Sequence, residues 1–355
     1  MPGKLNIIPE TDSSLWDSLV ASFSACDIYY TRKYVSPYIL AGDGIPYLIY
    51  FEGENGMRLC YPILESPLSS CGPLGQFPGV EGLADWSTPY GFGGPILEKE
   101  NKEDLDDFFP QLSTYCRNKG IISQFIRFHP VFQNQVPLQN YLKTACLKQT
   151  ICMDISPEID IMAELDSKNR NMVRKARKNG IEIRLEPVAD SLPAFLDLYY
   201  GTMARNEADG YYYFSQEFFD RFCTEMGADL YIFNAWHQGV IISSSMIMSY
   251  GTALHYHLSG ADRECLHLSP NNLLLYEVAK WGQSIGALTF HLGGGVEALD
   301  SLYHFKRSFN KNGLLNFSIG SNIFCPEVFE ELVAFRKSTD PGYNELNSRM
   351  IKYRA

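Results

Sequence analysis

A lysine flanked by aromatic residues, shortly after three glycines, is the side chain whose setting most suggests chemistry. The glycines are Gly293-Gly294-Gly295, and the lysine is Lys306, preceded by Phe305. When an amine attacks an ester or thioester carbonyl, negative charge gathers on the oxygen, and a fixed ammonium stabilises it. Aromatic neighbours can limit water, which strengthens that charge. In the alternative reading, Phe305 and Phe309 pack in the core at helical spacing and Lys306 points into water.

A second candidate is a cationic helix predicted between residues 168 and 183. At helical spacing five cations share one arc: Arg170, Arg174, Lys175, Arg177 and Lys178. The opposite arc carries Met172, Val173 and Ala176. A solvated helix face would give the same pattern. Because the whole chain has a formal charge of −11, this concentration of positive charge favours phosphates docking nearby, on a nucleotide, a lipid pyrophosphate or a tRNA.

Other polar residues can contribute to binding. Arg205 precedes an aromatic run that starts at Tyr211, and an arginine fork grips phosphate or carboxylate with two parallel hydrogen bonds. A surface ion pair beside core aromatics is the alternative for Arg205. Tyr211 and Tyr256 are candidate substrate contacts.

His255 and His257 project from one face of a predicted strand, where they could ligate a metal or serve as a base. No third ligand stands at metal spacing, so a structural pair is favoured and no metal is predicted.

Composition and absent motifs narrow the function. The nine cysteines form no Cys-x-x-Cys pair, which argues against a disulfide framework or a zinc ribbon. No P-loop, nucleophile elbow or dinucleotide fingerprint is found, and this suits direct group transfer. The acidic balance opposes general nucleic-acid binding. No apolar run approaches the ~20 residues that span a bilayer, and residues 1–8 lack the pattern of a secretion signal. We therefore expect a cytoplasmic protein without a transmembrane segment.

The elements that position these residues follow one plan twice. Each copy has a hairpin, a helix, a glycine and a strand, which predicts an α/β (α+β) fold with a duplicated unit. The first copy spans 46–52, 57–65, 104–119 and 121–128, and the second spans 230–236, 240–250, 253–259, 270–285 and 287–292. A long loop, Ser66 to Pro95, interrupts the first copy, and its aromatic residues predict ordered packing. Ser269 is predicted to cap the helix that Pro270 opens.

Three stretches make the second half of the chain similar to the Fem family, the aminoacyltransferases that build peptidoglycan interpeptide bridges from aminoacyl-tRNA. They are Pro270-Asn271-Asn272-Leu273-Leu274 with the glycine, strand and Phe305-Lys306 that follow; KNRNMVRKARKNGIEI at 168–183; and Thr202-Met203-Ala204-Arg205. The resemblance implies two acyltransferase folds of the GNAT (Gcn5-related N-acetyltransferase) type with mixed sheets flanked by helices. The domains would be 1–150, completed by a C-terminal helix in 325–355, and 151–324. The long helical arm of some members is absent.

The same resemblance assigns roles to single residues. Lys306, with Phe305 shaping its surroundings, would stabilise the oxyanion near the tRNA acceptor end. Arg205 would contact phosphates of the acceptor precursor, and Lys33 is a weaker match for another phosphate contact.

The predicted function is therefore transfer of an aminoacyl group from aminoacyl-tRNA to an amine, forming an amide. The acceptor is a peptidoglycan precursor, a sugar or a small metabolite, and no cofactor is expected. CoA is disfavoured as donor because the stretch Asp262 to Asn272 contains no glycine whose backbone could wrap a pyrophosphate. Two alternatives remain: an acyl-CoA-dependent N-acyltransferase of the same fold, and a catalytically silent protein that binds nucleotide-linked or lipid-linked precursors.

Overall fold

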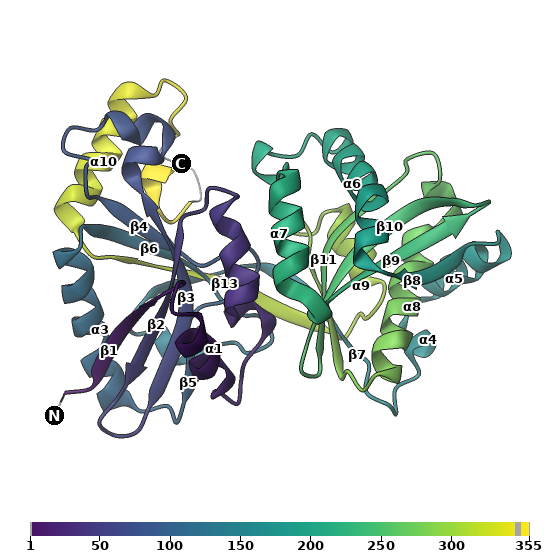
Figure 1. The fold of residues 1–355 in the computed structure, drawn as a ribbon, viewed down its shortest axis with the longest axis horizontal. Coiled ribbons are helices and arrows are strands. Elements are labelled where there is room, and N and C mark those ends of the chain that lie inside the picture. Colours follow the sequence, from purple (N-terminus) through teal and green to yellow (C-terminus); the bar gives the residue numbers. More distant parts are fainter. Residues whose placement is uncertain (1, 345–348, 355) are drawn as a thin grey trace. The chain divides into compact units, whose positions relative to one another are not determined.

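The computed structural model describes residues 2–344 and 349–354 and divides the chain into two compact units (Figure 1). Unit 1 comprises Met1–Leu147 and Phe317–Ala355, and unit 2 comprises Lys148–Asn316. The chain passes between the units within β7 (Lys143–Asp154) and again within β13 (Leu314–Ile323). The predicted domains assigned all of β13 to the second domain, whereas most of this strand lies in unit 1.

Unit 1 is built on a sheet in the order β1-β2-β3-β4-β6-β13, with β5 paired to β3. All neighbours are antiparallel except the parallel pair β4 and β6. Its strands are β1 (Lys4–Pro9), β2 (Ile45–Glu52), β3 (Arg58–Pro67), β4 (Ala84–Ser87), β5 (Ile96–Glu98) and β6 (Ile121–Arg127). Its α-helices are α1 (Ser13–Ala21), α2 (Arg32–Val35), α3 (Lys102–Asn118) and α10 (Pro326–Thr339).

The predicted hairpin in unit 1 is confirmed. Glu52 of β2 pairs with Arg58 of β3 around the glycine-containing turn. Asp104, in the first turn of α3 and 2% exposed, accepts hydrogen bonds from the backbone N–H groups of Asn55 and Met57, both at 3.1 Å. A carboxylate that accepts backbone N–H groups in this way ties the helix to the turn.

Unit 2 contains a sheet in the order β7-β12-β11-β10-β9-β8, in which only β11 and β12 are parallel. Besides β7, its strands are β8 (Glu182–Glu186), β9 (Leu230–His237), β10 (Val240–Tyr250), β11 (Ala253–Ala261) and β12 (Thr289–Gly294). Its α-helices are α4 (Ile161–Glu164), α5 (Ser167–Lys178), α6 (Val188–Arg205), α7 (Gln216–Met226), α8 (Pro270–Ser284) and α9 (Ser301–Arg307).

Helices α6 and α8 cover opposite faces of the unit 2 sheet. Adjacent residues of a strand point to opposite faces, and two adjacent residues of β9 contact different helices. On β9, Phe233 packs against Trp281 of α8, with ring centres 5.2 Å apart. The next residue, Asn234, donates a hydrogen bond to Ser191 of α6 at 2.9 Å. Figure 1 shows both helices beside β9 and β10. The sheet therefore has an α6 side and an α8 side.

Ser269 takes the predicted N-cap position of α8 and Pro270 begins the helix, but the predicted capping by the Ser269 side chain is wrong. Ser269 has a φ of +64° and makes no side-chain capping hydrogen bond. Its hydroxyl donates instead to the sulfur of Met172 on α5, at 3.4 Å. The left-handed backbone at Ser269 directs the hydroxyl away from the first N–H groups of the helix.

Within residues 2–344 and 349–354, no helix is long and apolar enough to cross a membrane. The longest described helix is α6, so the structure contains no long helical arm in this part of the chain.

Candidate active site

The parallel strands β11 and β12 separate partway along their length. Their pairing runs from Ala253 with Thr289 to His255 with His291. β11 continues to Ala261, and β12 continues to Gly294 alongside β7. On the other side of β11, the register with β10 shifts at His257, which has no directly opposed partner. The register of β12 with β7 also shifts, between His291 and Gly293. Such bulges bend the strands that carry them, and both lie just beyond the last pair of β11 and β12.

Lys306 reaches into the place where the two strands part. Its ammonium donates a hydrogen bond to the carbonyl of Gly294, the last residue of β12, at 2.8 Å. It also lies 5.3 Å from the ring centre of Tyr256, which directly follows the last paired residue of β11. The lysine is 8% exposed. The ammonium therefore contacts both strands at the point of separation.

Burial changes the acid–base behaviour of this lysine. Loss of hydration lowers the pKa of Lys306 from 10.5 to about 7, with a further lowering from the positive charge of Lys148. Asp300 acts in the opposite direction. At neutral pH the lysine is therefore divided between the ammonium and the neutral amine.

The glycine loop that follows β12 is held by two more charged residues. The Lys148 ammonium donates to the carbonyls of Gly295 and Val296, at 2.6 and 2.8 Å. The Asp300 carboxylate accepts from the backbone N–H groups of Val296, Glu297 and Tyr303, at 2.7, 3.0 and 2.7 Å. Neither residue was predicted. Asp300 has a local signal, since it stands where a helix N-cap is expected before Ser301. Lys148 has none.

Phe305 and Tyr256 take different places around Lys306. Phe305 lies beside Phe309, with ring centres 5.4 Å apart, and packs against the core of unit 2. The alternative interpretation is therefore correct in packing Phe305 with Phe309, but it is wrong in placing Lys306 in water, because Lys306 is buried. Tyr256 contributes its ring face to the ammonium, an arrangement that attracts cations. Of the predicted site residues, Lys306 and Tyr256 meet directly.

Arg205 is the last residue of α6, and its guanidinium donates to the carbonyl of Ala261 at 3.1 Å. Ala261 stands five residues beyond Tyr256 on β11, or about 16 Å along an extended strand. Arg205 is half-buried, and Tyr211 is exposed in a short 3-10 helix. The structure thus brings Arg205 to the far end of the strand that carries Tyr256.

The cationic helix is α5, and its predicted apolar side is confirmed by the burial of Val173 and Ala176. Arg174 and Lys178 are exposed. Arg170 is half-buried and donates to the carbonyls of Ala163 and Leu165, at 3.2 and 2.5 Å. The guanidinium of Arg170 therefore braces the segment before α5, while Arg174 and Lys178 remain available to a ligand.

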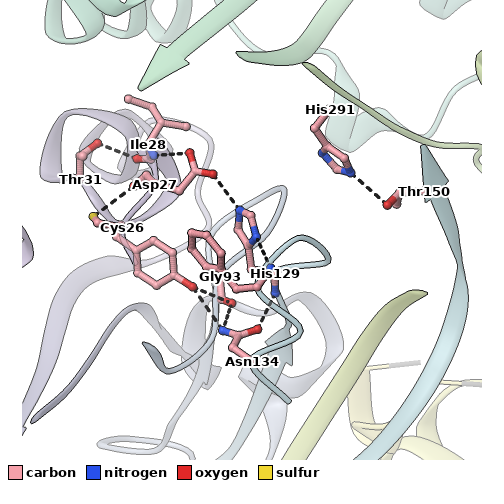
Figure 2. Close-up of polar contacts among 11 residues, drawn as sticks. Cys26, Asp27, Ile28, Thr31, Gly93, His129, Asn134, Thr150 and His291 are labelled. Atoms are coloured by element: carbon pink, nitrogen blue, oxygen red, sulfur yellow. Dashed lines mark hydrogen bonds and ion pairs between the residues drawn. The ribbon is translucent and has the colours of Figure 1, made fainter. Parts of the chain in front are cut away.

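The two histidines of β11 each lie beside another ring. The rings of His255 and His291 are 5.9 Å apart, and His257 stacks on Phe222 of α7 at 5.2 Å. Burial lowers the pKa of His257 to about 3, so its ring is neutral at physiological pH. His291 shares a hydrogen bond of 3.0 Å with Thr150, as Figure 2 shows.

Lys33 belongs to unit 1, where burial lowers its pKa.

Unit 1 has a buried polar cluster that no local sequence pattern predicts (Figure 2). His129 and Asp27 are 0% and 3% exposed, and their side chains meet at 3.0 Å. The backbone N–H of Phe132 donates to Nδ1 of His129, so the proton of the neutral ring is on Nε2, facing Asp27. Asn134 accepts from the backbone of His129 at 2.8 Å and donates to the carbonyl of Gly93 at 2.9 Å. This cluster connects three loops and has the character of a structural anchor.

Comparisons with known proteins agree with this geometry. Residues 167–307 match the model of the acetyltransferase (GNAT) domain, a segment that runs from α5 through Lys306. No curated protein matches the sequence. Among solved structures, FemX aligns with a TM-score of 0.67 and 15% identity, over 92% of this chain and 99% of that chain.

Two further structures each align with a TM-score of 0.54 and 12% identity. One is the C-terminal domain (DUF2156) of a putative lysylphosphatidylglycerol synthetase from Agrobacterium fabrum, with 91% of this chain and 97% of that chain covered. The other is L-PGS from Bacillus licheniformis, with 89% and 93% covered. At these identities the likeness concerns the fold. The chain has the fold of FemX, and the GNAT-like α/β fold expected from the Fem resemblance is confirmed.

Proposed function

We propose that this protein is an acyltransferase that moves an aminoacyl group from aminoacyl-tRNA to an amine and forms an amide bond. The observation that carries the proposal is the buried Lys306 ammonium, which contacts Gly294 and Tyr256 where β11 and β12 part. The match of residues 167–307 to a GNAT domain and the FemX-like fold support acyl transfer.

In the proposed step, the neutral amine of the acceptor attacks the ester carbonyl of the charged tRNA. A C–N bond forms, and the carbonyl oxygen becomes an oxyanion beside the Lys306 ammonium, which stabilises it. The C–O bond then breaks, and the ribose hydroxyl leaves with the proton that the amine has lost. No covalent enzyme intermediate is required. The carbonyl of Gly294 keeps the ammonium oriented, and burial strengthens its field.

The acceptor class is proposed from charge. Arg205 and the exposed cations of α5, among them Arg174 and Lys178, would hold phosphates of the tRNA or of a phosphorylated acceptor. Lys33 in unit 1 is a further candidate phosphate contact. A peptidoglycan precursor, a sugar or a small metabolite with a free amine fits this set.

The test is to incubate the protein with pools of charged tRNA and candidate amines, and to identify the amide product by mass. The main alternative is an acyl-CoA donor, which the same Lys306 geometry could serve. Tight CoA binding, with no product from aminoacyl-tRNA, would replace the proposed donor with CoA. Ligand binding without turnover from either donor would instead indicate a precursor-binding protein.

The pH dependence of kcat/KM should be bell-shaped. The Lys306 cation is lost as pH rises through its pKa of about 7. An α-amine acceptor becomes reactive only as pH rises toward its own pKa of about 8. The optimum is therefore expected between about 7 and 8, since kcat/KM reports groups of the free enzyme and substrate. Because arginine stays charged, the decline at high pH should disappear from any residual activity of Lys306→Arg. A decline that persists in this variant would show that another group causes it.

A further inference from the structure

Three successive backbone carbonyls in unit 2 each accept a hydrogen bond from a lysine ammonium. The first carbonyl, Gly294, accepts from Lys306. The second and third, Gly295 and Val296, accept from Lys148. Lys148 stands on β7, which pairs with β12, whereas Lys306 comes from α9. Two cations from separate elements thus hold the same short loop.

Asp300 completes this arrangement from the other end of the loop. One of its carboxylate oxygens accepts from Val296 and Glu297, and the other caps α9 through Tyr303. Val296 therefore contacts Lys148 through its carbonyl and Asp300 through its N–H. Since α9 carries Lys306, the position of the Lys306 ammonium depends on the loop at both ends.

We infer that Lys148 is a positioning residue for Lys306. It fixes the loop that directly follows Gly294, whose carbonyl orients the Lys306 ammonium, and it places a second positive charge near that ammonium. A catalytic consequence of this inference rests on the proposed function. The geometric part rests on the hydrogen bonds of Lys148 and does not require a known substrate.

The electrostatic consequence has a definite sign. Three charged or titratable groups surround the Lys306 ammonium from different elements: Lys148 on β7, Asp300 before α9, and Tyr256 on β11. The charge of Lys148 lowers the pKa of Lys306, and that of Asp300 raises it. Removing the Lys148 charge should therefore raise the pH at which Lys306 loses its proton.

The test compares Lys148→Met with Lys148→Arg. The reactivity of the Lys306 amine toward a small anhydride is measured against pH by trace labelling and mass spectrometry, which needs no substrate. In Lys148→Met the labelling midpoint should move upward, with about a threefold higher ratio of ammonium to amine at pH 7. Transfer should fall by about tenfold because the loop loses two hydrogen bonds. In Lys148→Arg the labelling midpoint and the transfer rate should both stay near their wild-type values.

Two further variants make the result specific. Lys280→Met removes an exposed lysine of α8 and should leave the midpoint unchanged. Asp300→Asn should move the midpoint downward, which keeps the test informative if Lys148→Met folds poorly. A midpoint that is the same in wild type and Lys148→Met would overturn the inference. If the midpoint shifts as expected but no donor gives product, the proposed function fails and the positioning role stands.

Discussion

Lys306→Met is expected to lower the rate of aminoacyl transfer by about 10²- to 10³-fold, the usual effect of removing one oxyanion-stabilising group. Methionine keeps an unbranched chain of similar length, so the packing beside Tyr256 and Gly294 should survive while the charge is lost. Single-turnover measurements with charged tRNA would isolate the chemical step. Lys280→Met, which removes an exposed lysine, should retain wild-type rates.

The same substitution should stabilise the folded protein at low pH. Because the pKa of Lys306 is about 7 in the fold and near 10.5 when unfolded, the unfolded state binds more protons between these values. Burial of the lysine therefore lowers the free energy of unfolding most below pH 7, by a few kcal/mol, and this loss becomes smaller as pH rises toward 10.5. Denaturant unfolding at pH 6 and pH 10 should show Lys306→Met more stable than wild type at pH 6, with the gap closing by pH 10. A variant that loses stability at both pH values and keeps its transfer rate would contradict the assigned role.

The elements with strong local signals were predicted well. β10 was predicted with its observed bounds, and α8 and the Gly53–Gly56 turn within a residue or two. These segments carry regular apolar patterns bounded by glycine or proline, which restrict the backbone directly. The sequence motif Phe305-Lys306 identified the candidate lysine. The burial of Lys306 between two strands was not predicted, because it depends on Tyr256 and on the separation of β11 from β12.

The features that were missed depend on distant parts of the chain. β4 lies inside the predicted loop Ser66 to Pro95. A strand of four residues surrounded by glycines, prolines and serines is too short to show the alternation of apolar and polar residues that predicts a strand. Its strand identity comes from pairing with β3 and β6 on either side. Lys148 contacts a loop almost 150 residues later in sequence. Asp27 and His129 are 102 residues apart. No local pattern encodes such pairings, so they became visible only in the folded chain.

Asp27→Ala is expected to destabilise unit 1 by about 2–5 kcal/mol, because it leaves two buried hydrogen-bond donors without their acceptor, at about 1–3 kcal/mol each. His129 would keep a buried Nε2–H group without its carboxylate acceptor, and the backbone N–H of Ile28 would lose a 2.5 Å hydrogen bond. Denaturant titrations followed by hydrogen exchange of the unit 1 strands would measure the loss. Asp12→Ala is a matched control, since Asp12 is exposed and makes no side-chain cap to α1.

A double-mutant cycle decides whether the Asp27–His129 pair acts as a unit. Asp27→Asn keeps one of the two acceptor oxygens of Asp27, so it should cost less than Asp27→Ala. If the pair is coupled, His129→Gln should cost much less in the Asp27→Ala background than in wild type. Additive losses would mean that each side chain is held by separate neighbours, such as Phe132 for His129 and Ile28 for Asp27. Coupling of the expected size would instead make this pair the anchor that holds the loop after β6 against the 3-10 helix beginning at Ile28.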